Sequence, residues 1–158
     1  MRIINTRTAI RGLTFHNSRS APDSLPIVSE PPLPPMELNL DRPRDYLFVR
    51  RADARSVTIV DRPFTASIIL ARDKVIDDWG VSDVTAMTPA HAEPILALQP
   101  DVVLLGTGEH QQFPSQAVLA AFLQRGVGVE VMDNAAAART WDVLASEGRN
   151  VVAVFILS

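Results

Sequence analysis

Three apolar runs separated by two segments of helical character fill the C-terminal part of the chain. The runs are residues 102–105, 127–132 and 151–157, and each is rich in valine or leucine. Between them lie one helical segment that ends at Gly126 and another from Ala135 to Glu147. Strand–helix–strand–helix–strand order is typical of a layered α/β sheet whose strands are buried on both faces. The sequence therefore predicts an α/β fold here.

Each expected helix begins with a residue that can cap it. Ser115 precedes the first of these helices, and Asp133 or Asn134 precedes the second. Their side-chain oxygens are suited to accept hydrogen bonds from amides of the first helical turn. An earlier helix is predicted from Thr88 to about Leu98, shortened or distorted by Pro94 because proline lacks an amide hydrogen.

Short strands are expected in the preceding part of the chain. They are residues 46–49, 56–60 and 64–70. Their connections are too short for parallel crossovers, so an antiparallel meander is predicted. Residues 61–63 are expected to form a turn. Residues 73–80 are expected to form an acidic loop, anchored to the core by its three large apolar side chains.

Residues 1–35 differ in composition from the rest. Six of the 14 residues from 22 to 35 are proline, and the first 22 residues hold four arginines and no acid. Such a start fits an organelle transit peptide. The alternatives are a disordered or extended N-terminal extension, or a true start at Met36. A single α/β domain is expected over residues 36–158.

Composition excludes several classes of site. The chain has no cysteine, which rules out disulfides and thiolate ligands and leaves the compartment undecided. The three histidines lack metal-ligand spacing, no apolar run reaches the roughly 18–20 residues of a membrane span, and no catalytic constellation stands out. Arginines without interleaved aromatics, at a net charge of −3, argue against nucleic-acid binding. No cofactor or metal is predicted.

Two loops are candidates for a ligand site. Gly106, Thr107 and Gly108 follow a predicted strand, where glycines allow backbone amides to approach an anion. Neither the third Rossmann glycine nor a P-loop lysine is present, so a tight turn is the favoured alternative. Glu109 and His110 beside the loop would form an acid/base pair only if they face each other.

The second loop follows the next strand. Asp133 and Asn134 lie at its carboxyl end, the edge at which open α/β sheets bind ligands. Arg139 and Thr140 lie one turn further on and are placed to face the same cleft. Helix capping is the alternative for Asp133 and Asn134, and a salt bridge or packing over Trp141 is the alternative for Arg139. The candidate ligand site comprises Gly106, Thr107, Gly108, Asp133, Arg139 and Thr140.

Three sequence blocks resemble the MTH-type domain family. They are Gly-Thr-Gly-Glu-His-Gln-Gln-Phe-Pro at 106–114, Gly-Val-Gly-Val-Glu-Val-Met-Asp at 126–133 and Ala-Ala-Ala-Arg-Thr-Trp-Asp-Val-Leu-Ala-Ser-Glu-Gly-Arg at 136–149. The family includes bacterial proteins of unknown function, the mitochondrial complex I assembly factor 3 and the adipogenesis-associated MTH-domain protein. The resemblance covers Met36 to the end. It implies a three-layer α/β fold, in which helices flank a central mixed sheet and the N-terminal half adds a small antiparallel β layer.

The resemblance implies no established activity or cofactor. The family pattern carries Thr, Cys, Tyr and Asn where this chain has Asn134, Ala138, Trp141 and Asp142. If those positions form a site in the family, the loss of the thiol and the phenol argues against a shared chemical mechanism, but it does not affect the expected fold.

Two functions are therefore expected from different classes. The first is a soluble, non-enzymatic assembly factor in the bacterial cytoplasm, with a protein partner such as subunits of a membrane respiratory complex. A mitochondrial location would follow if residues 1–35 are a transit peptide. The second is a binding protein or enzyme for an anion or nucleotide in the cleft between residues 106–108 and 133–134. The oligomeric state is left open.

Overall fold

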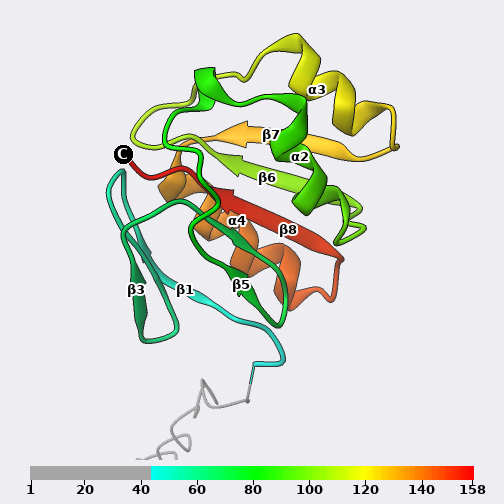
Figure 1. The fold of residues 1–158 in the computed structure, drawn as a ribbon. Coiled ribbons are helices and arrows are strands. Elements are labelled where there is room, and N and C mark those ends of the chain that lie inside the picture. Colours follow the sequence, from blue (N-terminus) through cyan, green and yellow to red (C-terminus); the bar gives the residue numbers. More distant parts are fainter. Residues whose placement is uncertain (1–43) are drawn as a thin grey trace, which may run out of the picture. The chain divides into compact units, whose positions relative to one another are not determined.

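The computed structural model describes residues 44–158, so the predictions for residues 1–35 lie outside it. A mixed five-stranded sheet forms the centre, in the order β5-β4-β8-β6-β7 (Figure 1). β6 runs parallel to β7 and β8, whereas β4 runs antiparallel to β5 and β8. The strands are β4 (Ile68–Leu70), β5 (Val75–Ile76), β6 (Val102–Gly106), β7 (Gly128–Met132) and β8 (Val151–Phe155).

Helices and a second, smaller sheet cover the two faces of the central sheet. One face packs against α2 (Pro89–Leu96), α3 (Gln116–Leu123) and the short 3₁₀ helix η2 (Val84–Ala86). The other face packs against α4 (Asn134–Ser146) and an antiparallel sheet of β1 (Val49–Ala52), β2 (Val57–Ile59) and β3 (Arg62–Phe64) (Figure 1). The predicted three-layer α/β fold with a small additional antiparallel sheet is confirmed.

The central strands are buried on both faces. In β6, Val103 and Leu105 join the core under α2 and α3, and Leu104 joins the core under α4. β8 alternates in the same way and lies in the middle of the sheet. This explains why these strands read as continuous apolar runs, and the expectation that residues 151–157 lie well covered is confirmed.

The meander prediction is wrong in part. Its first strand begins at Val49, three residues later than expected, and its turn is formed by Val60 and Asp61 because Arg62 and Pro63 belong to β3. The predicted strand 64–70 is two strands in different sheets, since Ile68–Leu70 pairs with β8. The acidic loop contains a strand, β5, although its apolar side chains do pack on the core as predicted.

The helix starts agree with the sequence. The Ser115 Oγ accepts from the amide of Val118 at 3.4 Å, and Asp133 Oδ1 accepts from the amide of Ala136 at 2.7 Å. α2 starts after Thr88 and contains Pro94, and it ends at Leu96, two residues earlier than expected. Among residues 44–158, no helix combines the length and apolar character needed to cross a bilayer.

Candidate functional site

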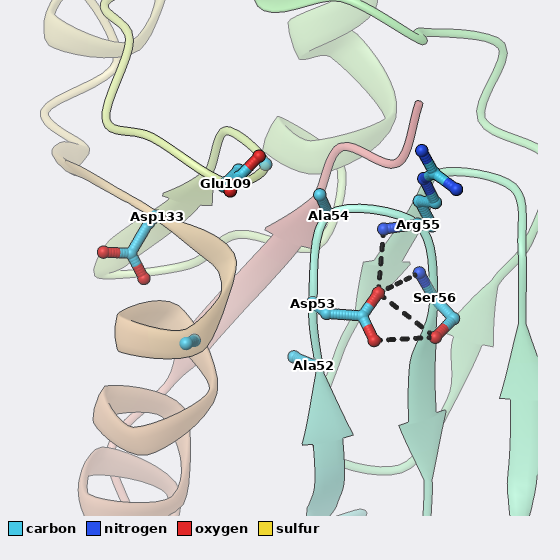
Figure 2. A pocket seen from close by; sticks show the side chains of 9 residues that line it. Ala52, Asp53, Ala54, Arg55, Ser56, Glu109 and Asp133 are labelled. Carbon is cyan, nitrogen blue, oxygen red and sulfur yellow. Dashed lines mark hydrogen bonds between the residues drawn. The ribbon is translucent and has the colours of Figure 1, made fainter.

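A shallow hollow of about 520 Å³ lies where three segments meet (Figure 2). The segments are the turn between β1 and β2, the loop after β6, and the start of α4. The two predicted loops therefore do come together at one edge, and a third segment that was not predicted joins them. The lining residues are Ala52, Asp53, Ala54, Arg55, Ser56, Gly108, Glu109, Asp133 and Ala135.

Asp53 organises the turn between β1 and β2. Its Oδ1 accepts from the amides of Arg55 at 2.9 Å and Ser56 at 2.8 Å, and the Ser56 hydroxyl lies 3.2 Å from Oδ2 (Figure 2). These amide hydrogen bonds lower the pKa of the Asp53 carboxyl below its usual value, with a smaller contribution from Arg51. The carboxylate is thus committed to holding the turn.

Asp133 is committed to α4 in a similar way. Its carboxylate caps the helix through the amide of Ala136. The negative charge of this side chain therefore already compensates part of the positive end of the helix dipole. Figure 2 shows the carboxylates of Asp53 and Asp133 pointing away from each other. They do not form the facing pair that general acid/base chemistry on one substrate atom would need.

Asn134 ties the three segments together. It is fully buried, and its Oδ1 accepts from the amide of Gly108 at 3.1 Å. Its Nδ2 donates to the carbonyls of Asp53 and Ile156, both at 2.9 Å. All three bonds join Asn134 to backbone far away in the sequence. Asp133 is therefore the cap, and Asn134 is the first residue of the helix and the link between loops.

The structure requires glycine at both glycine positions of the predicted anion loop, Gly106 and Gly108. A Cβ on Gly106 would lie 2.5 Å from Asn134 Oδ1 and 2.9 Å from the carbonyl oxygen of Val154, so only glycine fits there. Gly108 has a φ of 97°, a conformation that other residues rarely adopt. The amide of Gly108, which an anion would need, donates to Asn134.

Thr107 and the residues after it stabilise the loop. The Thr107 hydroxyl lies 2.7 Å from the carbonyl oxygen of His110 and 3.2 Å from that of Met132, and it accepts from the amide of Gln112 at 3.0 Å. Glu109 and His110 are both exposed, and only Glu109 lines the hollow.

Arg139 and Thr140 lie away from the hollow. Arg139 is exposed on α4, and neither residue lines the hollow. The Thr140 hydroxyl donates to the carbonyl of Ala136 at 2.9 Å, within its own helix. Of the six predicted ligand residues, Gly108 and Asp133 line the hollow. Gly106 and Thr107 are buried and do not line it, and neither do Arg139 and Thr140.

The charges at the hollow are mainly negative. Three carboxylates, those of Asp53, Glu109 and Asp133, line it together with one cation, Arg55. An anion bound there would meet unfavourable charges, because carboxylates repel it at short range. Within residues 44–158, no group of three or more histidine or acidic side chains is arranged to hold a metal ion.

Sequence reasoning missed the contribution of the turn at Asp53, Arg55 and Ser56. An aspartate followed three residues later by serine, between two strands, is a recognisable turn signal. That signal places the turn between two strands but does not place it beside α4, which lies about eighty residues further along the chain.

The fold and the hollow define a compact α/β domain with a mixed sheet, whose loops at one edge are joined by buried hydrogen bonds. Residues 49–156 match the family described as a protein of unknown function, DUF498/DUF598. The match covers more than half of the chain, and the chain belongs to this family.

Solved structures agree with the family assignment. The NMR structure of a Xanthomonas campestris protein is 48% identical and has a TM-score of 0.67, with 77% of this chain and 92% of that chain covered. A Bordetella pertussis protein described as a Mth938-like domain is 26% identical, with a TM-score of 0.61 over 70% of this chain and 85% of that chain. The resemblance to the MTH-type domain family is confirmed.

The chain is also similar to two kinds of curated relative, a bacterial membrane protein and a mammalian assembly factor. A Francisella tularensis protein named 13 kDa major membrane protein is 32% identical over 90 residues, which are 56% of this chain and 73% of that protein. The mouse NADH dehydrogenase [ubiquinone] 1 alpha subcomplex assembly factor 3 is 30% identical over 113 residues, or 70% of this chain. The match spans 60% of the mouse protein's length.

Proposed function

We propose that this protein is a non-enzymatic interaction protein that assists the assembly of a membrane respiratory complex. The observation that carries the proposal is the 30% identity over 113 residues with the mouse NADH dehydrogenase assembly factor. Since 70% of this chain takes part in that match, the similarity extends over most of the domain rather than one motif.

The hydrogen bonding at the hollow supports a binding role over catalysis. The polar atoms of Asp53 and Asn134 form hydrogen bonds with backbone groups of the protein itself, and Asp133 caps α4. A catalytic acid or base needs its polar atoms directed at a substrate. These side chains instead fix the relative positions of three loops, which suits a rigid recognition surface.

The proposed setting is the cytoplasm of a bacterial cell, where the domain would meet subunits before or during their insertion in the membrane. Xanthomonas and Francisella relatives support the bacterial setting. The partner proposed is a subunit of the respiratory NADH dehydrogenase.

Crosslinking followed by affinity purification tests this proposal. The full-length tagged protein is expressed at native level, crosslinked in cells and purified, with an unrelated tagged α/β protein of similar size as the control. We expect NADH dehydrogenase subunits in the first sample and not in the second. In cells lacking the gene, we expect less fully assembled complex on a native gel. Unchanged assembly together with no enrichment of those subunits would refute the proposed role.

A thermal-shift panel separates binding of proteins from binding of small molecules. Nucleotides and phosphorylated metabolites at millimolar concentration are expected to leave the melting temperature unchanged, because the hollow is lined by carboxylates. A clear rise with one of them would favour a ligand-binding function instead.

A further inference from the structure

β7 is an edge strand of the central sheet and pairs on one side with β6. In a parallel pair, alternate residues of a strand direct both backbone groups to the same neighbour. The amide of Gly128 donates to the carbonyl of Asp101 at 3.4 Å, and the carbonyl of Met132 accepts from the amide of Thr107 at 2.9 Å. Residues 128, 130 and 132 therefore face β6, whereas Val129 and Val131 direct their N–H and C=O groups outward.

A side chain from the loop after β6 supports this direction. The Gln111 Nε2 donates to the carbonyl oxygen of Val131 at 2.8 Å, and Gln111 is exposed. Within residues 44–158, no other hydrogen bond reaches the outward groups of Val129 or Val131. A strand edge with free backbone donors and acceptors is a template for an additional strand.

Exposed apolar side chains flank β7 at both ends. Leu123, the last residue of α3, is 75% exposed, and the amide of Val127 donates to the carbonyl of Phe122, which places the end of α3 beside the start of β7. Phe113 is 63% exposed and follows Gln111 by two residues, near the other end. An extended segment beside β7 would run between these two side chains and shield them from water.

The negative charge of Glu130 disfavours a second copy of this chain as the strand that pairs with β7, and it favours a different partner. If two copies paired through the full length of β7 about a two-fold axis, Val129 of one would face Val131 of the other. The two exposed Glu130 side chains would then stand directly opposite each other, and like charges in that position are destabilising. A basic side chain in the same position would be attracted to Glu130.

We propose that β7 accepts an extended strand from a different protein, with a basic residue opposite Glu130 and apolar residues beside Leu123 and Phe113. The Gln111 side chain swings away as the strand binds and releases the carbonyl of Val131. The added strand extends the central sheet from five strands to six. This inference rests on the proposed interaction role and names the surface that performs it.

The test uses one variant that blocks the outer edge and one that does not. Val129→Pro removes the outward amide hydrogen and leaves the ladder to β6 intact, since the Val129 amide takes no part in it. Val129→Thr keeps the amide and a β-branched side chain of similar shape, and serves as the matched control. Two synthetic peptides of alternating valine and threonine are the probes, one with a central lysine and the other with a central glutamate.

Amide hydrogen exchange, followed by NMR on the full-length protein, gives the readout. We expect the amides of Val129 and Val131 to exchange quickly in the free protein. The lysine peptide at millimolar concentration should slow both by about tenfold, and the glutamate peptide should have little effect. Glu130→Lys should reverse this preference. In Val129→Pro the protection of Val131 should be lost, and in Val129→Thr it should persist.

Three results of the exchange measurements would overturn the proposal. They are equal protection by the two peptides, no protection by either, and protection that rises with protein concentration in the absence of peptide, which would identify a second copy as the occupant.

Crosslinked purification of the same variants separates this proposal from the assembly role. If Val129→Pro recovers respiratory subunits as well as the natural protein does, the edge proposal fails and the assembly role stands. If the peptide results hold but no such subunits are recovered, the assembly role fails and the docking edge stands.

Discussion

Asn134 is a single side chain that holds three segments through three hydrogen bonds to backbone groups. Replacement by alanine leaves the amide of Gly108 and two carbonyls without these partners in a buried place. We expect Asn134→Ala to lower the free energy of unfolding by about 2–4 kcal/mol, measured by urea denaturation. Asp133→Ala removes only a helix cap and should cost about 1 kcal/mol. Equal effects of the two substitutions would show that the links between loops contribute little.

Gly106 gives a second prediction at this scale, with a glycine of the neighbouring strand as its control. A Cβ on Gly106 would overlap Asn134 Oδ1 and the carbonyl of Val154, whereas a Cβ on Gly128 would meet only Val102 Cγ2 at 3.9 Å. Gly106→Ala should therefore destabilise the protein by about 1–3 kcal/mol. Gly128→Ala should change stability by less than about 0.5 kcal/mol. Thermal unfolding of both variants tests this difference, and a tolerated alanine at 106 would contradict the close approach.

Asp142 provides a pH-dependent prediction. Burial raises the pKa of its carboxyl above the ordinary value of 3.8, and this outweighs the hydrogen bond from the amide of Val49 and the charge of Arg44. A group with a raised folded-state pKa contributes stability below its unfolded pKa and loses that contribution as pH rises through its folded pKa. At neutral pH the ionised carboxyl of Asp142 therefore stabilises the fold less than its protonated form would.

Asp142→Asn removes this titration and keeps an acceptor for Val49. We expect the variant to melt at a higher temperature than the natural protein at pH 7. The difference should shrink as pH falls through the raised pKa of Asp142 toward 3.8. A difference that stays constant over this range would mean that ionisation of Asp142 is not its cause.

The sequence identified individual residues only where their role is local. Asp133 was predicted as a cap because its partner, the amide of Ala136, lies three residues away. Asn134 was predicted as a cap or a ligand contact, but its partners Asp53 and Ile156 lie 81 and 22 residues away. Local spacing carries no information about such partners, so the buried link could be found only in the fold.

At the scale of elements, α2 depends on a capping interaction that involves a histidine. The His91 Nδ1 accepts from the amide of Thr88 at 2.9 Å, in the position usually held by glutamate or glutamine in a capping box. We expect His91→Ala to destabilise the protein by about 1 kcal/mol, and His91→Gln to restore most of that loss. Thermal unfolding of the two variants distinguishes a capping role of the His91 ring from a packing role. If the ring only packed against its neighbours, both variants would be equally unstable.

The elements that were predicted correctly differ from the others in the range of their contacts. α3 and α4 show apolar stripes and caps within a few residues, and β6 and β8 are apolar throughout. Residues 68–70 were assigned to the wrong sheet, because their partners are residues 153–155 near the end of the chain. The continuous apolar run Ile-Ile-Leu is typical of a strand that is buried on both faces. This signal favours the central sheet for residues 68–70.

At the scale of the whole molecule, the domain prediction of residues 36–158 leads to a test. The family match covers residues 49–156, and the two hydrophobic clusters of the described domain are built from residues 46–157. β8, close to the end of this range, pairs with both β4 and β6 and so joins the early and late parts of the central sheet. A domain whose core is closed in this way should fold without the first 35 residues.

We therefore expect a chain that starts at Met36 to melt within about 2 °C of the 158-residue chain. Its amide NMR spectrum should retain the positions of the peaks from the central sheet. A chain that ends after Phe155 is the informative comparison, because it loses Ile156 and Leu157, which are both buried, and the acceptor that Ile156 provides for Asn134. That shorter chain should be strongly destabilised. If the Met36 chain were destabilised to a similar degree, residues 1–35 would have to be part of the folding unit, and the domain boundary would have to be moved.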